Sequence, residues 1–128
     1  MLAERELYRP LVLCVDDDEE ILGLLRMVLE QKGYRVLTAN GGSTALEAFV
    51  ASAVDAVVLD YEMPGMNGGE VAQEMMRLNP KVPKLLFSGN TSFPSEVAGV
   101  FQGYCPKPLG LCTLTSQIGT MTSVAKSA

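Results

Sequence analysis

The stretch that decides the fold is Ala56-Val57-Val58-Leu59-Asp60, followed directly by the turn-forming residues Tyr61-Glu62-Met63-Pro64-Gly65-Met66-Asn67-Gly68. The apolar run has no polar interruption, which is typical of a parallel strand covered on both of its faces. Asp60 stands at the carboxyl end of this strand. In open α/β sheets, ligands bind in the crevice outside the carboxyl ends of the strands. Asp60 is therefore the first candidate functional residue.

Apolar runs alternate with helical patterns along the rest of the chain. Strands are predicted at Leu11–Val15, Tyr34–Ala39, Asp55–Asp60, Val82–Ser88 and Gly103–Lys107. Helices are predicted at Glu19–Lys32, from about Ser43 to Val50, at Gly69–Leu78, and from Leu109 to about Ser123. Between Gly89 and Gly99 the pattern predicts only a weak helix, which Pro94 interrupts. Five such units predict an α/β fold with a doubly wound parallel sheet.

Composition excludes several classes of function. The chain has 128 residues, which favours one domain, and its net charge of -5 argues against a general nucleic-acid surface. It contains no histidine, so histidine acid–base catalysis, Ser-His-Asp triads and common zinc sites are excluded. The mixed, polar start of the chain predicts neither a signal peptide nor a membrane span, so we expect a cytoplasmic protein. The three cysteines lack metal-ligand spacing, and Cys14 is interpreted as a small buried hydrophobe.

Polar residues that can carry chemistry follow four of the predicted strands. Asp16 and Asp17 follow the first strand, Asp60 ends the third, Ser88 ends the fourth and Lys107 ends the fifth. These strand ends meet at one edge of a doubly wound sheet. Clustered carboxylates there are unfavourable unless a hard cation neutralises them, and an ammonium and a hydroxyl complete the groups needed to stabilise a phosphoryl group.

Together these segments resemble the receiver domain of two-component response regulators. The resemblance extends from about Leu11 to about Ile118. It rests on Val15-Asp16-Asp17-Asp18, Leu59-Asp60-Tyr61-Glu62-Met63-Pro64-Gly65-Met66-Asn67-Gly68, Leu86-Phe87-Ser88-Gly89 and Tyr104-Cys105-Pro106-Lys107-Pro108, which occur in the family's order. It implies a flavodoxin-like fold with strand order 2-1-3-4-5. We expect a single, stand-alone receiver domain over residues 1–128, with its core at about 10–123 and no output domain.

The resemblance also implies roles at the acidic site. Asp60 would accept a phosphoryl group from a sensor histidine kinase or a phosphotransfer protein. Asp17, Asp60 and the backbone carbonyl of Glu62 would bind Mg²⁺, and Asp16 would hold a water of the metal and orient the site. The chain would then be a phosphoacceptor that assists its own phosphorylation and dephosphorylation, rather than a conventional enzyme.

Further implied roles concern the last two strands. Lys107 would pair with Asp60 and then with the phosphoryl group, and the Lys107-Pro108 bond would be cis. Ser88 would donate a hydrogen bond to a phosphoryl oxygen. Tyr104 would change rotamer as Ser88 moves and would carry the signal to a protein target. The resemblance implies no nucleic-acid or membrane partner.

Simpler interpretations of these residues stay open. The acidic run after the first strand also suits a solvated helix start, and Asp60 alone also suits a plain strand-end acid. Ser88 is read either as a phosphoryl contact or as a turn cap, and Tyr104 either as a switch or as a half-buried core tyrosine. Glu62 either reaches the phosphoryl site or faces water.

Three other functions stay open besides the phosphorylated switch. A scaffold that signals without phosphate would explain the short region between Ser88 and Lys107. An aspartate-nucleophile phosphatase of the dehalogenase type usually has a second aspartate where this chain has Glu62, and it usually has a cap domain. A flavin or nucleotide binder needs a Ser-, Thr- or Gly-rich phosphate cradle after the first strand, where this chain has carboxylates.

Overall fold

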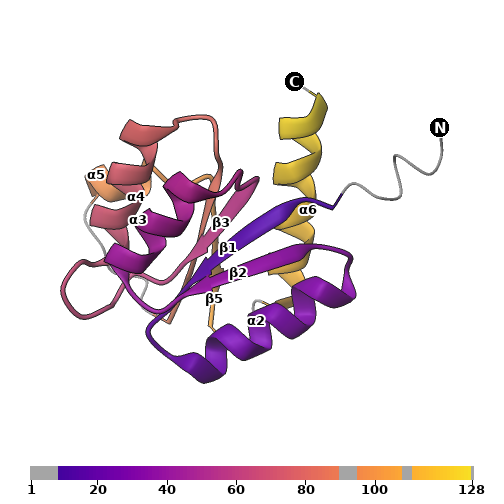
Figure 1. The fold of residues 1–128 in the computed structure, drawn as a ribbon, viewed down its shortest axis with the longest axis horizontal. Coiled ribbons are helices and arrows are strands. Elements are labelled where there is room, and N and C mark those ends of the chain that lie inside the picture. Colours follow the sequence, from indigo (N-terminus) through magenta and orange to yellow (C-terminus); the bar gives the residue numbers. More distant parts are fainter. Residues whose placement is uncertain (1–8, 90–94, 108–110, 128) are drawn as a thin grey trace.

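The computed structural model describes residues 9–89, 95–107 and 111–127, and Figure 1 draws its fold. Its five strands form one parallel sheet in the order β2-β1-β3-β4-β5, which confirms the predicted architecture. The strands are β1 (Leu11–Val15), β2 (Arg35–Ala39), β3 (Ala56–Leu59), β4 (Lys84–Ser88) and β5 (Gly103–Pro106).

Helices cover the sheet on both faces, as Figure 1 shows. One face carries α2 (Glu19–Gln31) and α6 (Leu111–Ser127), and the other carries α3 (Gly42–Ala51), α4 (Gly68–Leu78) and α5 (Ser95–Ala98). Alternate strand residues therefore enter two separate cores. For example, Leu13 and Leu59 pack toward α3 and α4, whereas Cys14 and Val58 pack toward α2 and α6. Burial on both sides explains why the central strands β1 and β3 are continuously apolar.

The helix bounds differ in places from those predicted. Helix α3 begins at Gly42, one residue before the predicted start at about Ser43, and its N-cap residue Gly41 supplies no side-chain hydrogen bond. Among the described residues, which resume at Ser95, α5 comprises Ser95–Ala98, in line with the expected weak helix. Pro94, Leu109 and the Lys107-Pro108 bond with its expected cis geometry lie outside the described residues.

Cys14 and Cys105 behave as core residues. Cys14 and Cys105 are fully buried and free of disulfides, as the sequence predicted for Cys14. Burial raises the pKa of the Cys14 thiol to about 12, so the reactive thiolate is disfavoured there.

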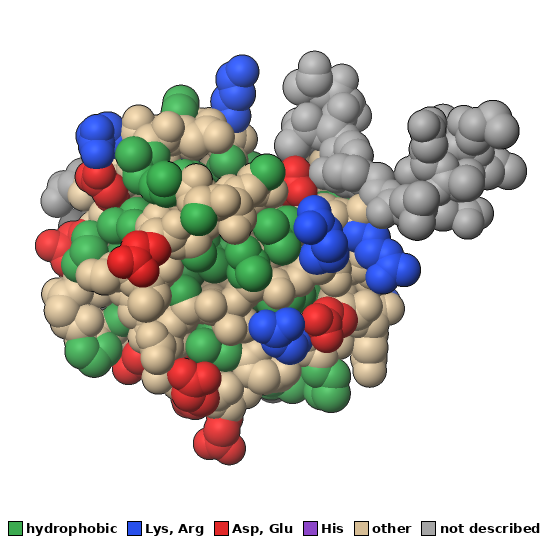
Figure 2. Space-filling view, viewed as in Figure 1, with side chains coloured by type: hydrophobic (Ala, Val, Ile, Leu, Met, Phe, Trp, Pro, Cys, Tyr) green, Lys and Arg blue, Asp and Glu red, His purple; other side chains and the backbone are tan. Residues whose placement is uncertain are grey.

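The surface gives two further results. Among the described residues, every helix is too short or too polar to cross a lipid bilayer. On the face drawn in Figure 2, basic and acidic side chains are scattered, and two basic side chains lie next to each other at the right. That face therefore lacks the continuous basic stripe that nucleic-acid backbones attract.

Candidate functional site

Backbone hydrogen bonds hold the strand-end residues at one edge of the sheet. The Asp60 N–H donates to the Val15 carbonyl at 3.0 Å, one residue beyond the end of β3. In the same way, the Asp16 N–H donates to Ala39 and the Lys107 N–H donates to Ser88, both at 3.1 Å. The backbone hydrogen bonds between the strands thus continue for one residue past the strand ends. They fix the backbone positions of the residues that carry the functional side chains.

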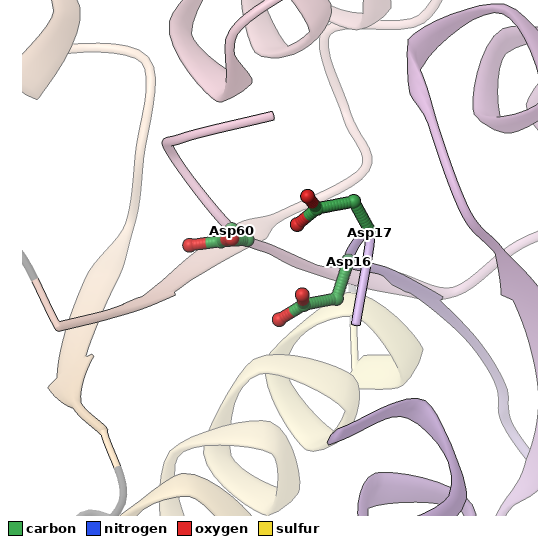
Figure 3. Close-up of side chains that lie close together, drawn as sticks. All are labelled: Asp16, Asp17 and Asp60. Atoms are coloured by element: carbon green, nitrogen blue, oxygen red, sulfur yellow. The ribbon is translucent and has the colours of Figure 1, made fainter. Parts of the chain in front are cut away.

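Three carboxyl groups meet at this edge. Asp16 and Asp17 follow β1 and Asp60 follows β3, and one oxygen atom of each lies within 4.8 Å of those of the others. Figure 3 shows the three carboxyl groups projecting to the same side of the strand ends. Asp16 and Asp60 are buried, whereas Asp17 is exposed. The structure therefore brings together the carboxylates that the sequence predicted to meet.

The Lys107 ammonium reaches the same cluster from β5. Its Nζ lies 2.6 Å from Asp16 Oδ2 and 3.4 Å from Asp60 Oδ2. The resemblance implied a pair with Asp60, but here the shorter contact is with Asp16. One ammonium thus bridges two buried carboxylates, which partly compensates their repulsion.

The two oxygens of Asp16 have different surroundings. Oδ1 accepts a hydrogen bond from the Asp18 N–H at 2.9 Å. Oδ2 is buried, and within the described residues no well-directed hydrogen bond reaches it besides the close Lys107 ammonium. A buried oxygen facing two further carboxylates suits a hard divalent cation, because Mg²⁺ prefers carboxylate and carbonyl oxygens.

Burial and charge shift the protonation of this cluster. Burial raises the pKa of Asp60, the Asp16 carboxylate raises it further, and Lys107 opposes both. Burial alone would lower the pKa of Lys107, but Asp16 and then Asp60 more than offset it, so that pKa is raised. Without a further cation, the site therefore holds a firmly protonated lysine and an aspartate whose negative charge is disfavoured.

Ser88 and Tyr104 lie beside the cluster on β4 and β5. Ser88 is buried, and the Tyr104 hydroxyl donates a long, 3.4 Å hydrogen bond to the Ser88 carbonyl. Tyr104 is half-buried and borders a cavity of about 250 Å³ that Leu86 and Phe101 also line. The two residues expected to act as a switch are therefore in contact, through the Ser88 backbone.

The turn after Asp60 depends on two glycines. Gly65 has a φ of +83°, which residues with a side chain rarely adopt. At Gly68, a Cβ atom would lie 2.1 Å from the Asp60 carbonyl oxygen, so only glycine fits where α4 begins. Asn67 caps that helix in a capping box with Glu70. Glu62 is exposed within this turn.

Two features of the site were missed at the sequence level. The Lys107 ammonium lies over the Phe87 ring, 5.8 Å from its centroid, although nothing in the sequence links these residues. The sequence places Gly68 among the turn-forming residues but does not indicate its close approach to the Asp60 carbonyl. Both depend on side-chain paths and backbone approach, which spacing along a chain does not specify.

A larger cavity, of about 400 Å³, lies away from this cluster. Phe49, Val50, Leu78 and Val82 line it, together with Asp55, whose carboxylate accepts a hydrogen bond from the Leu11 N–H. The cavity therefore combines apolar walls with a carboxylate that already serves the fold. The chemistry-bearing residues gather at the strand carboxyl ends instead.

Comparisons with known proteins agree with this geometry. A family model described as the response regulator receiver domain matches residues 12–118. The chain is 37% identical over 110 residues to the response regulator MprA of Mycobacterium leprae, which covers 84% of this chain and 48% of that protein. It is 42% identical over 112 residues to the autoinducer 1 sensor kinase/phosphatase LuxN of Vibrio campbellii, covering 86% of this chain and 13% of that protein.

Solved structures share the fold. The response regulator TrrA of Thermotoga maritima, crystallised in complex with Mg²⁺-BeF, superimposes with a TM-score of 0.83 at 30% identity, covering 88% of this chain and 98% of that one. The chemotaxis protein CheY4 of Vibrio cholerae gives a TM-score of 0.82 at 28% identity, covering 89% and 99%. The chain belongs to the response regulator receiver domain family of two-component signalling. It spans about half of MprA and a small part of LuxN.

Proposed function

We propose that this chain is a phosphorylation-controlled switch that accepts a phosphoryl group on Asp60 in the presence of Mg²⁺. The observation that carries the proposal is the convergence of the Asp16, Asp17 and Asp60 carboxyl groups within 4.8 Å, with the Lys107 ammonium beside two of them. Such a site suits the transfer of a group whose oxygens are negatively charged, because cations can surround it on several sides.

The donor set fits a magnesium ion. Asp17 and Asp60 would hold it with the backbone carbonyl of Glu62, and Asp16 would orient a water of the ion. Mg²⁺ keeps several waters and takes one or two carboxylates plus a phosphate oxygen, which matches this set. When bound, the ion would neutralise charge on the phosphoryl oxygens. The relative TrrA, solved with Mg²⁺-BeF, supports this reading.

The transfer step uses the carboxylate of Asp60 as the nucleophile. One Asp60 oxygen attacks phosphorus as the bond from phosphorus to the donor breaks, and the electron pair of that bond leaves with the donor. For a phosphohistidine donor, the leaving group is an imidazole nitrogen. Lys107 would turn from Asp16 toward the new phosphoryl group, and the Ser88 hydroxyl would donate a hydrogen bond to one of its oxygens.

The product would act by changing protein contacts rather than by steady turnover. Tyr104 touches the backbone of Ser88 and borders a cavity, so a shift of Ser88 toward the phosphoryl group would alter the position of its ring. Such small movements can select between two packed states. The downstream target would be a protein that recognises one of these states.

The partner that supplies the phosphoryl group would be a sensor histidine kinase or a phosphotransfer protein. The likeness to a segment of the sensor kinase/phosphatase LuxN supports a partner of this kind. We further propose that residues 1–128 act as a single receiver domain. Because the chain spans only part of its curated relatives, the role of the whole protein is part of this proposal.

A second candidate is a receiver that binds its target without phosphate. The short α5 helix, Ser95–Ala98, favours it, because α5 and β5 border the cavity beside Tyr104 and a shorter helix changes that surface. Equal affinity for a target with and without a phosphoryl mimic would favour the scaffold. A change in affinity would favour the switch.

Incubation with acetyl phosphate and Mg²⁺ tests the leading proposal. We expect intact-protein mass spectrometry to detect one added phosphoryl group, which disappears when EDTA replaces Mg²⁺. The Asp60→Asn variant should remain unmodified. Glu74→Gln, which changes a partly exposed carboxylate on α4 that is paired with Arg77, is the matched control and should be modified normally. Failure of the unaltered chain to gain mass, or equal modification of Asp60→Asn, would contradict the proposal.

A further inference from the structure

The Phe87 ring forms part of the floor beneath the site. Phe87 immediately precedes Ser88 on β4, and it is 1% exposed. Its side chain belongs to the core that faces α2 and α6, together with Cys105 and Leu114. The Lys107 Nζ lies over this ring, 5.8 Å from the centroid, which is within the range of a cation–π interaction.

The path of the Lys107 side chain explains why such a floor matters. Its backbone is fixed to β4 by the hydrogen bond from the Lys107 N–H to the Ser88 carbonyl. Its ammonium contacts Asp16 just after β1 and Asp60 just after β3, so the flexible side chain crosses the ends of β4 and β3. A lysine stem has four rotatable carbons and no rigid fork, so it needs neighbours to define its position.

The ammonium has contacts of two kinds. Two carboxylates attract it directly, and the electron-rich face of the ring attracts it from the core side. The Lys107 side chain is 18% exposed, so solvent reaches it only in part. An ammonium with few waters around it gains more from an aromatic face than one that is fully hydrated.

We propose that Phe87 is a positioning residue for phosphoryl transfer, whose ring face holds the Lys107 ammonium over the site. This inference rests on the proposed function. Phe87 would touch neither the phosphoryl group nor a metal ion, and it would act only through Lys107. When Lys107 leaves Asp16 for the new phosphoryl group, the ring would keep the ammonium close to the strand ends throughout the movement.

Plain core packing is the alternative role for Phe87. Changing the negative electrostatic potential of the ring face, while keeping the shape of the ring, distinguishes the two roles. Replacing Phe87 with 3,4,5-trifluorophenylalanine keeps the ring and nearly keeps its shape, but it weakens the negative potential of the ring face. If Phe87 acts on the charge of Lys107, phosphorylation by acetyl phosphate should slow by about threefold to tenfold. Pure packing would leave the rate unchanged.

The matched control is the same replacement at Phe49, which is buried in the core that faces α3 and α4. It should leave the rate of phosphorylation unchanged. A second variant, Phe87→Leu, removes the ring and should slow the reaction at least as much as fluorination. In a Lys107→Gln background, both changes at Phe87 should lose their effect, because the partner charge is gone.

A nuclear magnetic resonance readout needs no phosphoryl transfer. Protons above an aromatic face are shielded, so the Lys107 ε-methylene protons should resonate upfield of those of exposed lysines such as Lys81, and this shift should vanish in Phe87→Leu. Normal phosphorylation with an unshifted Lys107 methylene, or with no loss on fluorination, would overturn the role of Phe87 alone. No phosphorylation of the unaltered chain would instead overturn the proposed function, and with it the role of Phe87.

Discussion

Asp60 lies where a negative charge is unfavourable without a bound cation. It is 7% exposed, and the Asp16 carboxylate shares its surroundings. Because burial and Asp16 raise its pKa in the folded chain, folding favours the protonated form. Its contribution to stability is therefore largest at acidic pH and falls as the pH rises through the folded-state pKa. Above that pKa the folded chain carries the full penalty of the buried negative charge.

The Asp60→Asn variant should therefore be more stable than the unaltered chain at neutral pH in EDTA. We expect the free energy of unfolding to rise by about 1 kcal/mol, because an amide keeps the shape but removes the charge. Urea denaturation measures this change. Glu62→Gln, an exposed neighbour in the same turn, should change stability by less than about 0.5 kcal/mol. A clear loss of stability in Asp60→Asn would mean that Lys107 overcompensates the charge of Asp60.

The positions of the strand-end residues could be predicted from the sequence, but their pairings could not. Asp16, Asp17, Asp60 and Lys107 meet because parallel strands end at one edge, and apolar runs mark where strands end. The shorter contact of Lys107 with Asp16 depends on rotamers of a long side chain. The ring of Phe87 was indistinguishable in sequence from any other core residue.

The start of α4 is set by a contact between backbones. Gly68 follows the Asn67 cap, and its N–H donates to the Tyr61 carbonyl at 2.6 Å. A Cβ there would meet the Asp60 carbonyl oxygen at 2.1 Å and Tyr61 Cα at 2.8 Å. Backbone atoms cannot move aside as a flexible side chain can, so the turn that carries Asp60 would have to shift.

Gly68→Ala should therefore lower the free energy of unfolding by about 2–3 kcal/mol and weaken Mg²⁺ binding. Thermal or urea unfolding measures the first effect, and an amide-shift titration with Mg²⁺ measures the second. Gly23→Ala in α2 is the control, because nothing lies within 4 Å of its added Cβ. It should raise stability by about 0.5–1 kcal/mol through helix propensity. Equal effects of the two substitutions would contradict this account.

A further feature that the sequence did not reveal is a buried lysine at the start of β4. Lys84 is 1% exposed, and its Nζ donates to the Val82 carbonyl at 3.0 Å. Burial lowers the pKa of Lys84, so the unfolded chain holds this proton more tightly than the folded chain does. Stability should therefore rise with pH between the folded-state pKa and the ordinary lysine pKa.

Lys84→Met should remove that dependence. At neutral pH we expect the variant to be more stable by roughly 1–2 kcal/mol, because a buried charge is replaced by an apolar side chain. The difference should shrink as the pH approaches about 10, near the ordinary lysine pKa. Urea denaturation across this range measures it, with the exposed Lys81→Met as control. A variant less stable at neutral pH would mean that the lost hydrogen bond to Val82 outweighs the charge.

The overall fold was predictable because the strand patterns and the helix patterns in the sequence both favour the same architecture. Continuous apolar strands alternate with amphipathic helices, so only a sheet covered on both faces buries both patterns. Helix ends that lack a side-chain cap, such as the start of α3 at Gly42, were predicted less well from the sequence. Glycine caps leave a weaker signal than Ser, Thr, Asn or Asp caps, because no side chain accepts the first N–H groups.

The residues of the site come from segments that are far apart in the sequence and meet at the carboxyl ends of the strands. The acidic residues come from β1 and β3, the ammonium comes from β5, and Ser88 on β4 lies between them. Tyr104 then links this edge to the cavity beside α5. A charge added at Asp60 would therefore act on residues at the ends of β1, β3, β4 and β5. Through Tyr104, this effect would reach the surface beside α5.

The location of the transferred phosphoryl group tests this account most directly. After incubation with acetyl phosphate and Mg²⁺, borohydride reduces an aspartyl phosphate to homoserine, and peptide mass spectrometry locates that residue. We predict homoserine at position 60, dependent on Mg²⁺, with Asp16 and Asp17 unchanged. Homoserine at another aspartate, or none in a folded and Mg²⁺-saturated chain, would contradict the central claim.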